Sequence, residues 1–321
     1  MDFNFSFDNL TNDASDYERQ RFMAHLPKVI ATLGITMILA LVGNVTLAII
    51  IVSKSKNCLS PIEILILHTC LADILFALLT ILPQMATFLT IPSFHGSDFF
   101  CRLVKYAQLI PLYASPYLLV AISIDRYMAI CRPLVSYRFK YSMTHYLALG
   151  AWTLSLIFSV PNFVTVSLEM KNETAICLST DDINIEKVTV TFFAIFAWVI
   201  PTLIASILYT FVCLKVRKSS KLYAESCSNE SSRQSSKKVN LLKRHCVVST
   251  SKSISSTSCS LRSRKRLAAM NQVQGKRLSY KMKTVKLTLT IVSCNFILLA
   301  PFCMANCFET WFPHWSLGKP R

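Results

Sequence analysis

The sequence predicts an all-α integral membrane bundle, and three observations support this fold class. The 321 residues are 53% hydrophobic and only 16% charged, which is less charge than a soluble domain carries. The apolar residues gather in blocks long enough to cross the roughly 30 Å hydrocarbon core of a bilayer as helices. These blocks lack the alternation of apolar and polar residues that marks the strands of a membrane β-barrel.

Six such blocks follow one another along the chain, and we expect each to span the membrane. They cover residues 27–53, 63–89, 103–128, 145–168, 188–214 and 284–308. The bundle is therefore expected at 27–311, with an N-terminal tail at 1–26 and a short C-terminal tail at 312–321. Residues 216–282 form a basic loop that we expect to be largely disordered, because its serine-rich stretches cannot pack a core. The N-terminal tail has no apolar core, so it is not a signal peptide.

The basic residues predict the orientation of the bundle. Nineteen of the 34 Lys and Arg lie between Lys215 and Lys286, together with only Glu225 and Glu230, so this segment holds the whole net charge of +17. Because Lys and Arg collect in cytoplasmic loops, we expect this loop in the cytoplasm and the N-terminus outside, in a multi-pass protein of the cell membrane. Charge placed in this way indicates orientation and not a nucleic-acid partner.

Two kinds of site are predicted on the outer side. Asn4, Asn9 and Asn172 are N-glycosylation acceptors by their sequons. Of the twelve cysteines, only Cys101 and Cys177 lie where oxidation is natural, at the outer start of the third span and in the second outer loop. A bridge between them would tie that loop over the mouth of the bundle.

Polar side chains inside the spans are the candidate functional residues, because burying them in hydrocarbon is costly. Asn44 and Asp73 either bond each other and hold two helices together, or Asp73 binds an ion or a proton. Arg126, beside Asp125 at the inner end of the third span, is either a basic anchor or a functional group. We find no Cys-x-x-Cys spacing, no acid/base pair and no nucleophile with a nearby base, so we expect no metal, no cofactor and no enzyme activity.

Together these features resemble the rhodopsin-like family of G protein-coupled receptors. The matching elements are Gly43-Asn44, Leu71-Ala72-Asp73, Cys101, Asp125-Arg126-Tyr127, Trp152, Cys177, Pro201 and Pro301, in order over residues 27–311. The resemblance implies that Asp125, Arg126 and Tyr127 form a latch that meets a heterotrimeric G protein. A charge-assisted pair at the membrane boundary suits a latch, because it is partly desolvated yet close enough to water to break. The basic loop would face the G protein and anionic membrane lipid.

Two segments, 71–85 and 101–134, look like the vasopressin and oxytocin receptor group. This resemblance implies a peptide hormone or neuropeptide as ligand, bound at the outer mouth. By position, the residues that line its pocket are Gln84, Lys105, Gln108, Asn162 and Asn306. The last two stand where the group has glutamines. A ring of amides suits a peptide, because neutral donors and acceptors pair with its backbone without burying a charge.

The chain also departs from this group. Val29 stands where the group often has an acid, Thr87-Phe88 where it has Trp-Asp, and Leu298-Leu299 where it has Cys-Trp. No seventh apolar block with Asn-Pro-x-x-Tyr follows Pro301, so we expect six spans of the usual seven. A second interpretation is therefore a truncated receptor-like protein that cannot signal and modulates a full-length partner receptor. A transporter is a lesser alternative, since the internal repeats of that class are missing.

Overall fold

The structure is a computed structural model that describes residues 12–54, 59–90, 94, 96–134, 140–171, 174–179 and 182–245, and separate positions between 282 and 312. Helices make up nearly all of it, together with one two-stranded hairpin. Within the described residues, five helices are long and apolar enough to cross a bilayer: Leu26–Lys54, Pro61–Leu89, Asp98–Cys131, Ser142–Thr165 and Ile183–Leu222. These helices match the first five predicted spans, so the predicted all-α membrane bundle is confirmed. The shorter apolar helix Leu299–Phe308 lies within the sixth predicted span.

The first two spans lie side by side. Helix α1 (Asn12–Lys54) begins inside the predicted N-terminal tail and exposes most of its apolar side chains, as a lipid-facing helix does. The second span consists of α2 (Pro61–Leu75), the π-helical η1 (Phe76–Ile81) and α3 (Leu82–Thr90). Helix α2 begins where the Ser60 backbone N–H donates to Glu63 Oε2 at 2.7 Å, with proline at the first helical position.

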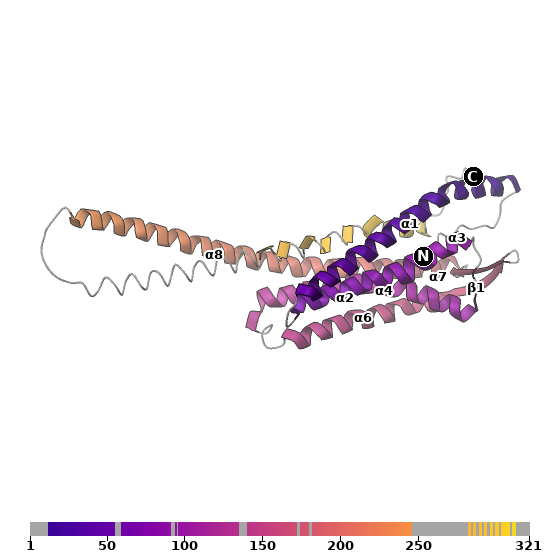
Figure 1. The fold of residues 1–321 in the computed structure, drawn as a ribbon, viewed down its shortest axis with the longest axis horizontal. Helices are drawn as coiled ribbons and strands as arrows, with labels where there is room; N and C mark the ends of the chain where they lie inside the picture. Colours follow the sequence, from indigo (N-terminus) through magenta and orange to yellow (C-terminus); the bar gives the residue numbers. More distant parts are fainter. Residues whose placement is uncertain are drawn as a thin grey trace.

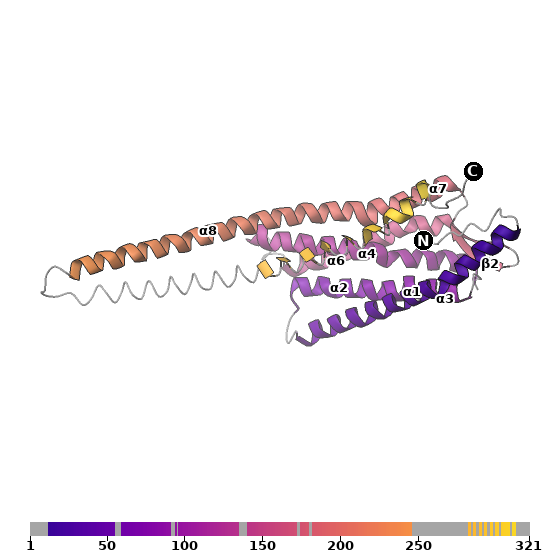
Figure 2. The same cartoon turned by 90° about the horizontal axis from the view of Figure 1, so that it is seen from above.

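Helix α4 (Asp98–Cys131) is the axis of the bundle. It contacts α2, η1, α6, η2 and α8, and most of its residues between Pro111 and Ser123 are buried. The helix begins at Ser97, whose hydroxyl accepts from the Phe100 backbone N–H at 3.3 Å. Figure 1 and Figure 2 show the other helices arranged around it.

The fourth span is shorter than predicted. Helix α6 (Lys140–Thr165) ends three residues before the predicted limit at 168, and the chain continues as β1 (Val166–Lys171) and β2 (Thr174–Ser179). The two strands pair antiparallel, with Leu168 opposite Cys177. Val166 and Leu168 extend the hydropathy of the span, but the chain here pairs with β2 as a strand and does not continue the helix. The predicted end of the span was wrong because hydropathy does not distinguish an apolar helix from an apolar strand.

The fifth span consists of α7 (Ile183–Phe193), the π-helical η2 (Ala194–Val199) and α8 (Ile200–His245). Both π-helical segments end two residues before a proline, at Pro83 and at Pro201. Proline cannot donate to the preceding turn and its ring crowds that turn, and a wider π turn accommodates both effects. Helix α8 projects well beyond the bundle, so residues 216–245 of the predicted loop are helical (Figure 1, Figure 2).

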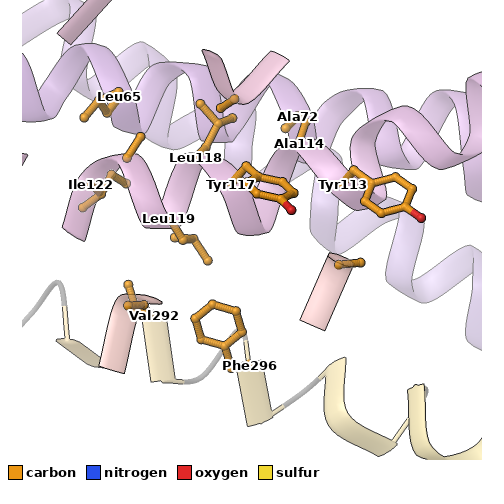
Figure 3. Packing of buried hydrophobic residues seen from close by; sticks show 14 of the residues in the cluster. Leu65, Ala72, Tyr113, Ala114, Tyr117, Leu118, Leu119, Ile122, Val292 and Phe296 are labelled. Carbon is orange, nitrogen blue, oxygen red and sulfur yellow. The ribbon is translucent and has the colours of Figure 1, made fainter. Parts of the chain in front are cut away.

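The buried core joins α4 to every neighbouring span. The described residues between Met282 and Trp311 are helical and lie along the fifth span. In Figure 3, Val292 and Phe296 of this last stretch face Leu119 and Ile122 of α4 across the core. Phe158 of α6 adds an aromatic cluster, with ring centroids 4.7 Å from Phe196 and 5.7–5.8 Å from Tyr117 and Tyr113.

Candidate functional site

The predicted site residues fall at the two ends of α4. Cys101 lies near its first turn and Arg126 near its last, so about 37 Å of helix separates them at about 1.5 Å per residue. We call the first region the disulfide end and the second the ion-pair end. One continuous, buried helix therefore links two chemically different sites.

At the disulfide end, the predicted bridge is confirmed. Cys101 and Cys177 are bonded, with their Cα atoms 5.7 Å apart. Two hydrogen bonds hold the same hairpin. The Leu168 backbone N–H donates to Asp98 Oδ1 at 2.8 Å, and the Phe94 backbone N–H donates to the Ala175 carbonyl at 2.6 Å. The β1–β2 hairpin is thus fixed to the start of α4 by the disulfide and the Asp98 bond, and to Phe94, which precedes α4, by a backbone bond.

Below the hairpin, α4 is tied to its neighbours through its backbone. The Asn162 side-chain amide of α6 donates to the Lys105 carbonyl at 3.0 Å. The Thr80 hydroxyl of η1 donates to the Gln108 carbonyl at 2.7 Å, and the Gln108 side chain is buried. The structure therefore brings Lys105, Gln108 and Asn162 together at the junction of the second, third and fourth spans.

The other two predicted pocket residues lie on other helices. Gln84 belongs to α3 and Asn306 to the last helical stretch, and both are partly buried. Asn4, Asn9 and Asn172, the predicted glycosylation sites, lie outside the described residues.

In the middle of the bundle, Asn44 and Asp73 bond to different partners. The Asn44 side-chain amide donates to the Ala40 carbonyl of its own helix at 2.9 Å. The Ser115 hydroxyl of α4 donates to Asp73 Oδ1 at 3.3 Å. Asp73 therefore links the second span to the third, and in the described residues no hydrogen bond joins it to Asn44. Helix pairing between Asn44 and Asp73, and the binding of an ion or a proton by Asp73, both stay predictions.

At the ion-pair end, Asp125 and Arg126 bond each other. Arg126 donates to Asp125 Oδ2 through both Nε, at 3.0 Å, and a terminal nitrogen, and both side chains are largely buried. Tyr127 packs on Phe211 of α8 with ring centroids 6.2 Å apart. Beside it, Val212, Val216 and Val285 form a small buried cluster that joins the fifth span to the last helical stretch.

Three contacts between helices were not anticipated from the sequence. The indole N–H of Trp152 donates to His68 Nδ1 at 3.3 Å, and that of Trp198 donates to the Phe296 carbonyl at 3.3 Å. Trp311 donates to the Thr191 hydroxyl at 3.0 Å, and the Lys187 ammonium lies 5.4 Å from its ring. A tryptophan inside a span indicates a hydrogen bond between helices, because its indole N–H needs an acceptor in hydrocarbon. Hydropathy does not identify which residue is the acceptor.

This arrangement suits binding and conformational coupling. One end offers amides and a lysine under a fixed hairpin, and the other offers an ion pair that water can reach. Among the described residues, no group of three or more His, Cys, Asp or Glu side chains could hold a metal ion.

Comparisons with known proteins agree with this description. Residues 43–319 match the model of the family "7 transmembrane receptor (rhodopsin family)". The chain is 36% identical to nematocin receptor 2 of Caenorhabditis elegans over 285 residues, which are 87% of this chain and 68% of that protein. It is 29% identical to cephalotocin receptor 1 of Octopus vulgaris over 94% of this chain and 72% of the relative. It is also 27% identical to the mouse vasopressin V1b receptor over 88% of this chain and 63% of that receptor.

Proposed function

Because the chain belongs to the rhodopsin family of seven-transmembrane receptors, and within it to the vasopressin and oxytocin type, we propose that it binds a peptide of that type and activates a heterotrimeric G protein. Membership of a family of signalling receptors agrees with the prediction that the chain is not an enzyme, and it gives no support to a transporter. The observation that carries the proposal is that α4 has Lys105 and Gln108 beside the Asn162 amide at one end and the Asp125–Arg126 pair at the other.

The peptide is proposed to bind at the disulfide end. Lys105, Gln108 and Asn162 lie at one junction of helices there, and the disulfide-linked hairpin lies beside them. Gln84 and Asn306 are proposed to complete the pocket from the second and sixth spans. Amide side chains recognise a peptide backbone through neutral hydrogen bonds, so binding would require no unpaired buried charge.

The G protein is proposed to bind at the ion-pair end. Breaking the Asp125–Arg126 pair would free the guanidinium for a partner, and the pair's position at the end of α4 lets water compensate the carboxylate. The exposed basic residues of α8 that follow, among them Lys215, Arg217 and Lys218, would face the G protein and anionic lipid. Peptide binding at one end would shift the population of ion-pair states at the other.

The orientation follows from the same proposal. The disulfide end is extracellular, because oxidation occurs there, and the N-terminus and any sugar on Asn4, Asn9 or Asn172 lie on that side. Asp73, bonded to Ser115, is proposed to be a polar link in the middle of the bundle, where an ion or a proton would neutralise it.

The test is nucleotide exchange on a heterotrimeric G protein in membranes that contain the chain. Nematocin, cephalotocin and vasopressin, the peptides in the names of the relatives, are the probes. We expect at least one to raise exchange, and Arg126→Ala to reduce the response while peptide binding persists. Arg102→Lys is the control, because it keeps a cation beside Asp98 at the other end of α4, so the response to peptide should persist. A flat response to all three peptides, with the chain at the surface, would contradict the proposal.

A further inference from the structure

A single indole connects the fifth span to the backbone of the last helical stretch. Trp198 lies in the π-helical turn η2, and its N–H donates to the Phe296 carbonyl at 3.3 Å. Trp198 is partly buried and packs against the main core cluster. The acceptor is a backbone oxygen. The contact therefore fixes the position of the helix backbone and not only that of one side chain.

The turn that receives this bond is the one that Pro301 weakens. Proline has no backbone N–H, so Pro301 cannot donate to the Ile297 carbonyl, and its ring crowds that carbonyl. Within a bilayer no water is at hand to satisfy loosened backbone groups, and donors from neighbouring helices take its place. Trp198 does not replace the bond that Ile297 loses; it donates to the adjacent carbonyl, that of Phe296, and so holds the turn that proline loosens.

Phe296 is held from two sides. Its carbonyl bonds to the fifth span, while its side chain is buried in the core and faces Leu119 of α4 (Figure 3). Further along the same stretch, towards the ion-pair end, Val285 packs with Val212 and Val216 of α8. The last stretch is therefore attached to the fifth span at mid-bundle by Trp198, beside the Asp125–Arg126 pair by Val285, and at the disulfide end by the Trp311 bond to Thr191.

We propose that Trp198 is a positioning residue that holds the last helical stretch against the fifth span in the arrangement where the Asp125–Arg126 pair is closed. Without the indole donor, the turn before Pro301 is free to change its bend, and the Val285 end separates more often from Val216. A hydrogen bond between helices in a membrane shifts such an equilibrium about threefold. The consequence for signalling, a higher basal activity, rests on the proposed function; the change in helix position does not.

The matched variant is Trp198→Phe, which keeps a six-membered aromatic ring and removes the donor together with the rest of the five-membered ring of the indole. The reporter is Val285→Cys, in a background where the free cysteines other than Cys70 are replaced, and its rate of labelling by a small thiol reagent is measured. Val285 is buried, so its labelling rate follows the fraction of time that the two helices separate. Cys70, buried in α2, reports general loosening of the bundle in the same sample.

We expect Trp198→Phe to raise labelling at position 285 about threefold and to leave labelling of Cys70 unchanged. Trp152→Phe removes an indole donor from a different pair of helices and is expected to leave position 285 unchanged. In addition, Pro301→Ala restores the missing amide, so Trp198→Phe should have a smaller effect in that background.

Three results would overturn the proposal: an unchanged rate at position 285, an equal rise at Cys70, or the same rise in Trp152→Phe. Basal nucleotide exchange is measured on the same membranes. Faster labelling at position 285 with no exchange under any condition supports the role of Trp198 and contradicts the proposed receptor activity. Faster labelling together with higher basal exchange supports both.

Discussion

Removing the Cys101–Cys177 bridge is expected to destabilise the protein to the same degree whether one cysteine or both are replaced. The bridge closes a loop with a sequence separation of 76, for which the chain-entropy relation gives about 4.5 kcal/mol against a fully unfolded chain. The spans remain in the bilayer when their packing is lost, so the real reference state is already restricted. We therefore expect a loss of between about 2 and about 4.5 kcal/mol for Cys101→Ser, Cys177→Ser and the double variant.

The measurement is the thermal unfolding midpoint in detergent, with the fraction of chain at the cell surface measured in parallel. Each single variant should lower both quantities, and the double variant should lower them no further, because the first substitution already breaks the bond. Cys213→Ser is the control, since that thiol is free and partly buried in α8, and it should leave both quantities nearly unchanged. Losses that add in the double variant would show that the two cysteines act separately and would refute the reasoning.

Two smaller changes test the packing around α4. Thr80→Val removes the hydroxyl that donates to the Gln108 carbonyl, so it should cost about 1 kcal/mol of stability and weaken peptide binding. Thr153→Val, whose hydroxyl bonds only to its own helix, should do neither. Phe158→Ala removes a ring that contacts four others and should cost about 3 to 5 kcal/mol in unfolding experiments. Ile157→Ala, at an exposed neighbouring position, should cost far less, and equal losses would contradict the aromatic core.

The buried position of α4 explains why these tests centre on one helix. Its neighbours bond to its backbone at Lys105 and Gln108, and Ser115 donates from it to Asp73. Such bonds keep their full strength only where hydrocarbon excludes water, so each of them restricts how α4 can rotate or slide. A change at the disulfide end therefore acts on a helix that several neighbours hold in place.

Several features were open to prediction because they depend on the chain alone. A backbone within hydrocarbon must form all its hydrogen bonds internally, and an apolar segment of this length does so as a helix. Five of the apolar blocks are accordingly the five long helices found among the described residues. Asp125 and Arg126 are adjacent in sequence, so their pairing needed no knowledge of the fold. The Cys101–Cys177 bridge followed from topology, since both lie on the side where oxidation was expected.

Other features depended on how helices rotate and meet. Asp73 bonds to Ser115 and Asn44 bonds within its own helix, because the rotation of each helix about its axis decides which polar groups face each other. The end of α6 at Thr165 was set by the pairing of β1 with β2, which local hydropathy does not record.

The sequence by itself determined that this protein is a membrane bundle of the rhodopsin type, which segments form the five long described helices, and which residues at their ends carry charge or a thiol. These properties depend on the free energy of placing polar groups in hydrocarbon, and that free energy is set by the composition of each segment separately. Only the tertiary structure decided that Asn162 meets Lys105, that Trp198 bonds to the backbone of Phe296 and that Asp73 reaches α4. Those contacts join residues far apart in sequence, and their geometry exists only once the helices have packed.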